Sequence, residues 1–306
     1  MIHSSTRKRL QEIVPALLAW HKNNRRSFIW RDLERSPYIV LVSEFMLQQT
    51  GTKQVEKHLP EFLRKFPTVR TLAAASQAEV VRAWHGLGYN RRAINLHRTA
   101  KAIGAMSKFP TTLDGLRTLP GVGLYTASAI LAFAHNADTA VVDVNIERVL
   151  SRLWKPMPDI HSKLPIADIY ELDGCILPQA QSASWHEALM DLGSTICTKN
   201  KPQCSQCPAR QWCPSKRNMK ISPTPGKSKE KKYFGEPRRI WRGRILKAVA
   251  DAETVSAPIL TATLRRKLKV KEASFVAFVL TVLTALTKEG FVIRTRKGAY
   301  RLAENK

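Results

Sequence analysis

The sequence predicts a mainly α-helical protein that ends in a small α+β domain. From Arg7 to about Leu192, apolar residues recur at i, i+3 and i+4, the spacing of a helix with one buried face, and alternating polarity is scarce. After residue 236 the helical spacing restarts and then gives way to a hairpin pattern. A chain of 306 residues with 44% hydrophobic residues is long enough for two or three domains with buried cores.

The first part of the chain is expected to form a helical domain over residues 1–215. Breakers such as the glycines at 86–88 and 121–123 separate its periodic segments. Helices are expected at residues 10–22, 36–49, 77–87, 90–106, 125–135 and 144–154.

The last part of the chain is expected to form a winged-helix domain over residues 237–306. Three helical segments, 240–250, 256–268 and 274–290, precede a basic hairpin that turns at Lys297 and Gly298. Residues 216–236, rich in Lys, Pro, Ser and Gly, have too little apolar content to pack, so we expect a basic linker there.

The charge balance favours a polyanionic partner. Fifty Lys and Arg residues against 24 Asp and Glu give a net charge of +26, and nucleic acid is the first candidate. An anionic membrane surface is the alternative, but the chain has no 18-residue apolar run, secretory signal or lipidation motif. We therefore expect an intracellular, cytoplasmic and nucleoid-associated monomer.

Four of the five cysteines crowd into one stretch, with the spacing C-x6-C-x2-C-x5-C. Four thiolates on a short loop can hold a [4Fe-4S] cluster, and we expect this cofactor in a structural role. Zinc is the alternative, although its sites usually pair two C-x2-C knuckles and only one is present here. The expected ligands are Cys197, Cys204, Cys207 and Cys213.

Two further features stand at the ends of one apolar segment. "LPGVG" can form a turn between helices whose glycines let the backbone approach a phosphate, although such a turn can also be a mere connection. Its residues are Leu119, Pro120, Gly121, Val122 and Gly123. Asp143 precedes the apolar positions of the 144–154 helix, so its simplest role is an N-cap.

These motifs together resemble the helix-hairpin-helix (HhH-GPD) DNA glycosylase superfamily, and most closely its adenine DNA glycosylase (MutY) branch. The resemblance covers residues 10–215 and includes "SEFMLQQT" (43–50), "GLGYNRRAINLH" (86–97), "LPGVGLYTASAI" (119–130), "VVDVNIERVL" (141–150) and "HEALMDLGSTIC" (186–197). It implies a two-lobed helical fold and base excision repair of double-stranded DNA with a mismatched or damaged base pair.

The resemblance also implies a division of labour between two carboxyl groups. Glu44, in an apolar run that should raise its pKa, would protonate the adenine, and an ionised Asp143 would stabilise the sugar cation. Asn145 would orient the Asp143 region. Tyr125 stands where a bifunctional branch carries a lysine, and a phenol cannot form a Schiff base, so we expect a monofunctional glycosylase.

Other positions match residues that contact DNA in the family, because the target nucleotide has to be swung out of the duplex. Arg26 and Trp30 would lie near the flipped base, although Trp30 could simply be core. Gln48, Gln49 and Tyr89 match inserting positions, with Gln48 equally able to serve as a surface amide. Lys199 and Lys201, inside the cysteine loop, could touch phosphates or only solvent.

Some positions depart from the adenine branch. Val144 replaces a usual glycine, Asn90 replaces a tyrosine, and the nudix-like domain that recognises 8-oxoguanine is replaced by the expected winged helix. A related branch excises thymine or uracil from mismatches with guanine and also carries tyrosine at the position of Tyr125, so this activity is the alternative. The third alternative is a non-enzymatic iron-sulfur regulator that binds DNA, but such a protein would not need two carboxyl groups with opposite protonation states. The winged helix could contact DNA or dock a protein.

Overall fold

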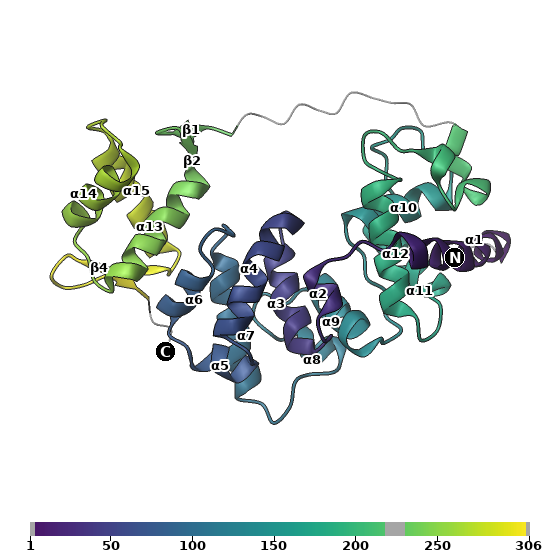
Figure 1. Ribbon diagram of the computed structural model, residues 1–306, viewed down its shortest axis with the longest axis horizontal. Helices are drawn as coiled ribbons and strands as arrows, with labels where there is room; N and C mark the ends of the chain where they lie inside the picture. Colours follow the sequence, from purple (N-terminus) through teal and green to yellow (C-terminus); the bar gives the residue numbers. More distant parts are fainter. Residues whose placement is uncertain (1–3, 218–229, 304–306) are drawn as a thin grey trace. The chain divides into compact units, whose positions relative to one another are not determined.

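The computed structural model describes residues 4–217 and 230–303, and the chain divides into two compact units. Unit 1 comprises residues 1–41, 111–118 and 122–227. Unit 2 comprises residues 42–110, 119–121 and 228–306. Helices dominate both units, as the sequence predicts (Figure 1).

Unit 1 is built from helices that are close together in the sequence except for the first two. Its α-helices are α1 (Ser4–Asn24), α2 (Ile29–Asp32), α8 (Leu113–Arg117), α9 (Leu124–His135), α10 (Val144–Trp154), α11 (Ile166–Ile176) and α12 (Ser182–Thr195). Three 3-10 helices follow, η1 (Cys204–Gln206), η2 (Arg210–Trp212) and η3 (Pro214–Arg217). The helix α3 (Pro37–Leu47) begins in unit 1 and ends in unit 2.

The core of unit 1 forms where α1, α10, α11 and α12 meet. The sequence spacing predicts that Ile146, Val149, Leu150 and Leu153 form the apolar face of α10, and all four are buried. Trp185 of α12 is fully buried among them. Each such side chain contributes about 1.5–3 kcal/mol through burial, which fixes the start of α10 against its neighbours.

Unit 2 contains two groups of elements. The first comprises α4 (Thr52–Lys65), α5 (Val69–Ala74), α6 (Gln77–Ala83) and α7 (Arg91–Gly104). Capping boxes at Thr68 and Ser76 begin α5 and α6, since each side chain accepts a backbone N–H of the first turn. The second group is the C-terminal module, residues 232–303.

The C-terminal module contains three helices and two hairpins. The helices are α13 (Arg238–Ala252), α14 (Ala257–Leu268) and α15 (Phe275–Lys288), and the strands are β1 (Lys232–Tyr233), β2 (Glu236–Pro237), β3 (Val292–Arg294) and β4 (Tyr300–Leu302). The β3–β4 pair is antiparallel, with Ile293 opposite Arg301, and Gly298 lies in its turn with φ +78°. The predicted hairpin around Lys297 and Gly298 is thus confirmed.

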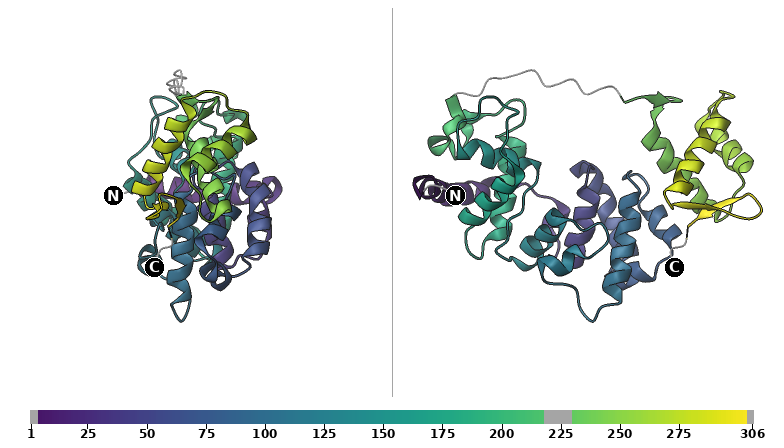
Figure 2. Two further views of the ribbon diagram at one scale, coloured as in Figure 1. Left: turned by 90° about the vertical axis from the view of Figure 1, so that its left-hand side faces the viewer. Right: turned by 180° about the vertical axis from the view of Figure 1, so that it is seen from behind.

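The C-terminal module shares its core with the first group of unit 2. Val81 of α6 and Ile94 of α7 belong to the same buried cluster as Trp241 and Ile245 of α13. The Arg82 guanidinium donates to the Ala250 carbonyl at 2.6 Å, and α13 lies beside α6 (Figures 1 and 2). A continuous apolar core of this kind fixes the module against α6 and α7.

The described end of the expected linker differs from the prediction. Tyr233 and Phe234 pack against the module's core, and the Tyr233 carbonyl accepts the Trp241 indole N–H at 2.5 Å. These two aromatic side chains bind the short β1–β2 hairpin to the helices of the module, although the segment around them is polar. Residues 218–229 of that linker lie outside the described residues.

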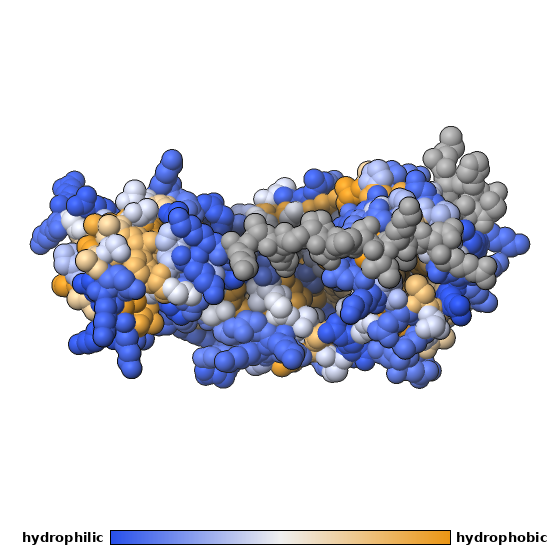
Figure 3. All heavy atoms as spheres, turned by 90° about the horizontal axis from the view of Figure 1, so that it is seen from above, coloured by the Kyte–Doolittle hydropathy of each residue, from blue (hydrophilic) through white to orange (hydrophobic). Residues whose placement is uncertain are grey.

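The surface of the C-terminal module carries apolar residues among hydrophilic ones (Figure 3). Ile259 of α14 and Val276 and Leu280 of α15 are exposed. Among the described residues, no helix has both the length and the apolar character needed to span a membrane.

Candidate active site

Asp143 caps the N-terminus of α10 through its own carboxyl group. Its Oδ1 atom accepts the backbone N–H groups of Asn145 and Ile146 at 2.9 and 2.7 Å. Its Oδ2 atom accepts the Asn145 side-chain amide at 2.8 Å. The N-cap predicted from the sequence is therefore present, and Asn145 holds the carboxyl group from a second direction.

The orientation of Asn145 is fixed by residues behind it. Its Oδ1 atom accepts from the Arg148 guanidinium at 2.9 Å, and the same Arg148 nitrogen donates to the Gly193 carbonyl at 2.6 Å. A Cβ atom at Gly193 would lie 2.7 Å from the Asn145 Cβ. Glycine at this position of α12 thus allows the close approach that places Arg148 and Asn145 behind Asp143.

The electrostatic environment of Asp143 combines burial with several hydrogen-bond donors. Desolvation raises the pKa of Asp143, and it outweighs the lowering effect of the Ile146 and Asn145 N–H groups and the Arg148 charge. The helix terminus by itself favours the anion. That Asp143 is ionised in the reaction stays a prediction.

The segment that leads into Asp143 is anchored by a buried histidine–aspartate hydrogen bond that the sequence analysis missed. The His186 Nε2 atom lies 2.7 Å from the Asp173 carboxylate, and neither side chain is exposed. The Val141 N–H donates to the same Asp173 oxygen at 3.1 Å, and the Trp185 indole donates to the other at 2.9 Å. Asp173 is one of three acids on α11 and nothing in the local sequence singles it out, whereas His186 stands in a quoted motif and had received no role.

Tyr125 lies in the first turn of α9 and is half-buried. It packs against the small apolar cluster formed by Ala129, Ala132 and Val141. Because Val141 stands two residues before Asp143, one cluster connects Tyr125 with the segment that carries the carboxyl group.

The glycine turn has the backbone that its sequence predicts. Gly121 has φ +77°, a region that favours glycine, and a Cβ atom there would lie 2.8 Å from the Asn95 side chain of α7. Gly123 is the N-cap of α9 and provides no side chain, so the first N–H groups of that helix receive no side-chain cap. Leu119 and Val122 are buried and hold the turn in place.

Glu44 is buried in α3, between Ser43 and Phe45, which are also buried. The burial expected from its apolar run is therefore confirmed. That Glu44 and Asp143 face the same nucleoside stays a prediction.

The predicted inserting residues occupy two strained turns in unit 2. Gln49 and Tyr89 have φ of +54° and +45°, which costs about 1 kcal/mol or more for a residue with a side chain. Arg92 joins the two turns, since its buried guanidinium donates to the Phe45 and Met46 carbonyls on one side and to those of residues 87 and 88 on the other. Gln48 is half-buried, and Tyr89 is 46% exposed.

Arg26 and Trp30 belong to a stacked group in unit 1. The Trp30 ring stacks on Phe28 with centroids 4.6 Å apart, and the Arg26 guanidinium lies 4.4 Å from the Phe28 centroid. Arg26 also donates to the Ser194 hydroxyl at 2.9 Å, while Asp191 accepts its backbone N–H. Trp30 is half-buried, and the contact of either residue with a flipped base stays a prediction.

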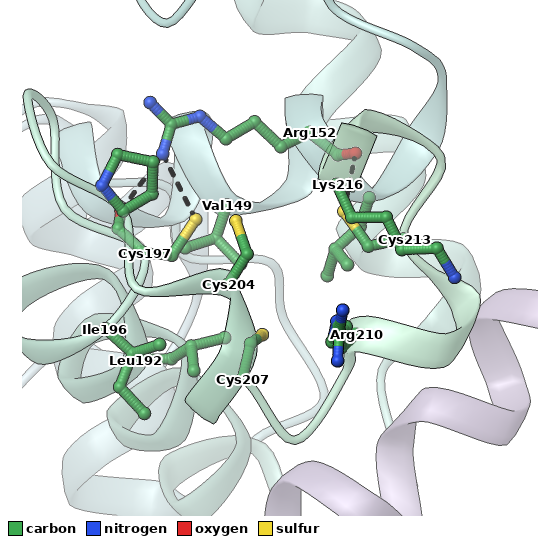
Figure 4. Close-up of a pocket in the computed structure, with 12 residues that line it drawn as sticks. Val149, Arg152, Leu192, Ile196, Cys197, Cys204, Cys207, Arg210, Cys213 and Lys216 are labelled. Carbon is green, nitrogen blue, oxygen red and sulfur yellow. Dashed lines mark hydrogen bonds between the residues drawn. The ribbon is translucent and has the colours of Figure 1, made fainter. Parts of the chain in front are cut away.

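The four clustered cysteines line a single cavity with apolar walls (Figure 4). Arg152 of α10 donates to the Cys197 sulfur at 3.3 Å, and the Cys213 sulfur lies 3.4 Å from the Arg152 carbonyl. Burial raises the pKa of Cys207 to about 12 and that of Cys213 to about 11. Among the described side chains, no set of three or more His, Cys, Asp or Glu converges tightly enough to hold a single metal ion.

The two lysines of this loop face solvent. Lys199 and Lys201 are exposed, and the Lys199 carbonyl accepts a long hydrogen bond from Arg152 at 3.4 Å. Phosphate contact by either lysine stays a prediction.

Comparisons with known proteins identify relatives of the chain. Residues 42–166 match the family described as HhH-GPD superfamily base excision DNA repair protein. An adenine DNA glycosylase of Mycobacterium tuberculosis (strain H37Rv) is 39% identical over 241 residues, 78% of each chain. One of Mycolicibacterium smegmatis is 35% identical over 291 residues, 94% of each chain. A solved thermostable thymine-DNA glycosylase superposes with a TM-score of 0.63 at 27% identity, covering 69% of this chain and 97% of that one.

Proposed function

Since the chain belongs to the adenine DNA glycosylase family of the HhH-GPD superfamily, we propose that it removes mispaired adenine from DNA in base excision repair. The observation that carries this proposal is the 35% identity to an adenine DNA glycosylase over 94% of both chains, which includes the C-terminal module. As a repair enzyme it acts where the DNA is, inside the cell. We propose guanine or 8-oxoguanine as the base opposite the adenine.

The proposed chemistry assigns opposite protonation states to two carboxyl groups. Glu44, buried in α3, donates a proton to the departing adenine, which lowers the negative charge that the base carries away. Asp143, ionised, stabilises the oxocarbenium-like sugar while water completes the hydrolysis. The three N–H groups that hold Asp143 fix its direction and favour its charged form against the effect of burial.

Tyr125 supports a monofunctional reaction. A lyase step needs an amine that attacks the sugar carbon, and the first turn of α9 presents a half-buried phenol instead. Breakage of the strand is therefore left to a later enzyme, and the product is an abasic site.

We propose that Cys197, Cys204, Cys207 and Cys213 hold a [4Fe-4S] cluster. The fit is supported by the common cavity of the four cysteines and by Arg152, whose N–H donation to the Cys197 sulfur would stabilise a thiolate. When bound, the cluster would cross-link the loop after α12 to itself, beside Arg152 of α10. The role is structural, and it presents Lys199 and Lys201 as phosphate contacts.

DNA binding is proposed to depend on backbone groups as well as on charge. The uncapped N–H groups at the start of α9, beside Gly121 and Gly123, are suited to a phosphate of double-stranded DNA. The C-terminal module, with three helices followed by the β3–β4 hairpin and a Val255–Tyr300 bridge, has the element order of a winged helix. We propose that it adds to the DNA contacts of a monomer.

A thymine glycosylase is the second candidate, favoured by the 27% identity to the solved thymine-DNA glycosylase and by Val144 after the catalytic aspartate. The test is to incubate the purified protein with duplexes that carry A·8-oxoG, A·G, T·G and U·G pairs, with and without alkali. Alkali-dependent cleavage at adenine is expected. Release of thymine without adenine would replace the proposal by the second candidate.

A further inference from the structure

A cavity of about 440 Å³ lies in unit 2 between the strained turns and the C-terminal module. Gln49, Tyr89 and Arg91 line one side, and Arg239 and Arg242 of α13 line the other. The volume falls in the range of sites that accept a ligand of nucleotide size. The arginines of α13 belong neither to the residues expected to insert into DNA nor to the expected wing of the module, so the proposed function gives them no role.

The chemistry of the cavity wall favours a phosphate-bearing ligand. Arginine contributes from both sides, and Glu289, the C-cap residue of α15, is the acid in the lining. Arg242 donates twice to Glu289, at 2.8 and 2.7 Å, the parallel geometry that a guanidinium also forms with phosphate. Arg91, 4.0 Å from Glu289, points its guanidinium over the Phe291 ring at 5.5 Å.

The Arg242–Glu289 pair can yield to a ligand. The Arg242 and Glu289 side chains are 25% and 36% exposed, and ion pairs with this exposure add little to folding stability. A DNA phosphate offers the same two oxygen acceptors, and its negative charge is balanced by the other arginines of the lining. Exchange of Glu289 for phosphate therefore keeps both guanidinium hydrogen bonds.

The cavity is held open by rigid parts on both sides. Trp241, next to Arg242, is buried in the core that α13 shares with α6 and α7. On the opposite side, Arg92 ties the turn at Gln49 to the turn at Tyr89 through backbone carbonyls. A preformed site loses less conformational freedom when it binds.

We propose that this cavity is a nucleotide subsite for bound DNA, in which a backbone phosphate replaces Glu289 on Arg242 and is also contacted by Arg239. The subsite rests on the proposed function, because it takes DNA as the ligand. It assigns the DNA contacts of the C-terminal module to α13, beside the inserting residues, instead of to the basic end of α14 and the tip of the hairpin.

Two charge-matched double variants of the full chain distinguish these surfaces. Arg239→Ala with Arg242→Ala should weaken binding to an A·G duplex at least about tenfold at 0.1 M salt and lower the salt dependence by about two counterions. The control, Arg266→Ala with Arg296→Ala, removes the same charge from α14 and the hairpin and should change the Kd less than about threefold. Equal losses, or a larger loss in the control, would overturn the subsite.

A variant that is expected to bind DNA more tightly distinguishes loss of the phosphate contact from misfolding. Glu289→Gln frees Arg242 from its internal partner, so DNA binding should tighten about threefold or more, whereas loss of structure could only weaken it. Glu272→Gln, an exposed acid of the same module outside the cavity lining, should change the Kd little. Tightening by the same factor in both variants would mean that only net charge matters, against the proposal.

The phosphate itself can be located by a double-mutant cycle. Single neutral methylphosphonates are placed in turn along both strands, and one position should weaken wild-type binding but not binding by Arg242→Ala. Additive effects at every position would refute the contact. Adenine release, measured separately at saturating protein, distinguishes failure of the proposed function from failure of the subsite. If the wild-type protein releases no adenine, the proposed function is refuted. If it releases adenine and the α13 variants bind DNA as the wild type does, the subsite alone is refuted.

Discussion

Asp143→Asn should separate the two roles that the structure gives to this side chain. As an N-cap, Asp143 accepts the N–H groups of Asn145 and Ile146 through one oxygen. Asparagine is as good an N-cap as aspartate, because its amide oxygen can accept the same hydrogen bonds. The substitution therefore keeps the start of α10 and removes the charge.

The expected magnitudes differ widely between stability and catalysis. Asp143→Ala deletes the cap and should cost about 1 kcal/mol, which lowers the Tm by about 2–4 °C in a chain of this size. Asp143→Asn should stay within about 2 °C of the wild type. The rate of adenine release by either variant should fall about 100-fold or more. Loss of one group that stabilises charge in the transition state typically slows an enzyme by this factor.

The raised pKa of Asp143 adds a dependence on pH. Burial makes the folded state prefer the neutral form of this carboxyl group. The contribution of neutral Asp143 to folding stability is therefore complete below about pH 4, the ordinary pKa of aspartate. It is lost as the pH rises through the raised value. Asparagine has no proton to lose, so the Tm of Asp143→Asn should rise relative to the wild type across this range.

Three measurements on each variant test the reasoning. Single-turnover release of adenine from an A·G duplex gives the rate, thermal unfolding followed by circular dichroism gives the Tm, and fluorescence anisotropy gives the Kd, which should be nearly unchanged. Wild-type turnover by Asp143→Asn would show that the residue is a cap and nothing more. A Tm as low as that of Asp143→Ala would refute the capping argument.

Three other changes have defined outcomes. Tyr125→Lys should gain strand cleavage without alkali and an enzyme–DNA complex that borohydride traps; a variant that still needs alkali would remove the explanation for the monofunctional reaction. Gly121→Ala should cost about 1–2 kcal/mol in chemical denaturation and weaken DNA binding, because its φ is +77° and Asn95 occupies the space of a Cβ, whereas Gly174→Ala, inside α11 with nothing within 4 Å, should not destabilise the protein. Cys207→Ser should lose iron, acid-labile sulfide and visible absorption together; stoichiometric zinc in the wild-type protein would instead favour the tetrahedral site.

Sequence proximity explains which parts of the site were predictable. The cap at Asp143 and the left-handed turn at Gly121 depend on a few adjacent residues, so residue type and spacing were sufficient to predict them. The helices followed from apolar periodicity for the same reason. The apolar run around Glu44 predicted its burial, since every neighbour on α3 favours the interior.

The anchor of the Asp143 segment was not predictable in this way. Asp173 lies 32 residues from Val141 in the sequence, and His186 lies 45 residues away. No local pattern distinguishes an acid that accepts a distant backbone N–H from an acid that faces solvent. The direction in which the pKa of Asp143 shifts could not be predicted for a related reason, because desolvation sums over atoms from several helices.

By itself, the sequence determined the helical segments, the N-cap, the glycine turn and the family to which the motifs belong. Only the tertiary structure decided that Tyr233 and Phe234 join a core with α13, that this core includes Val81 and Ile94, and that α13 thereby presents Arg242 to a cavity beside Tyr89. The physical reason is the range of the forces involved. Hydrogen bonds within a turn are set by neighbouring residues, whereas burial and the charge of a cavity are set by segments that meet only when the chain has folded.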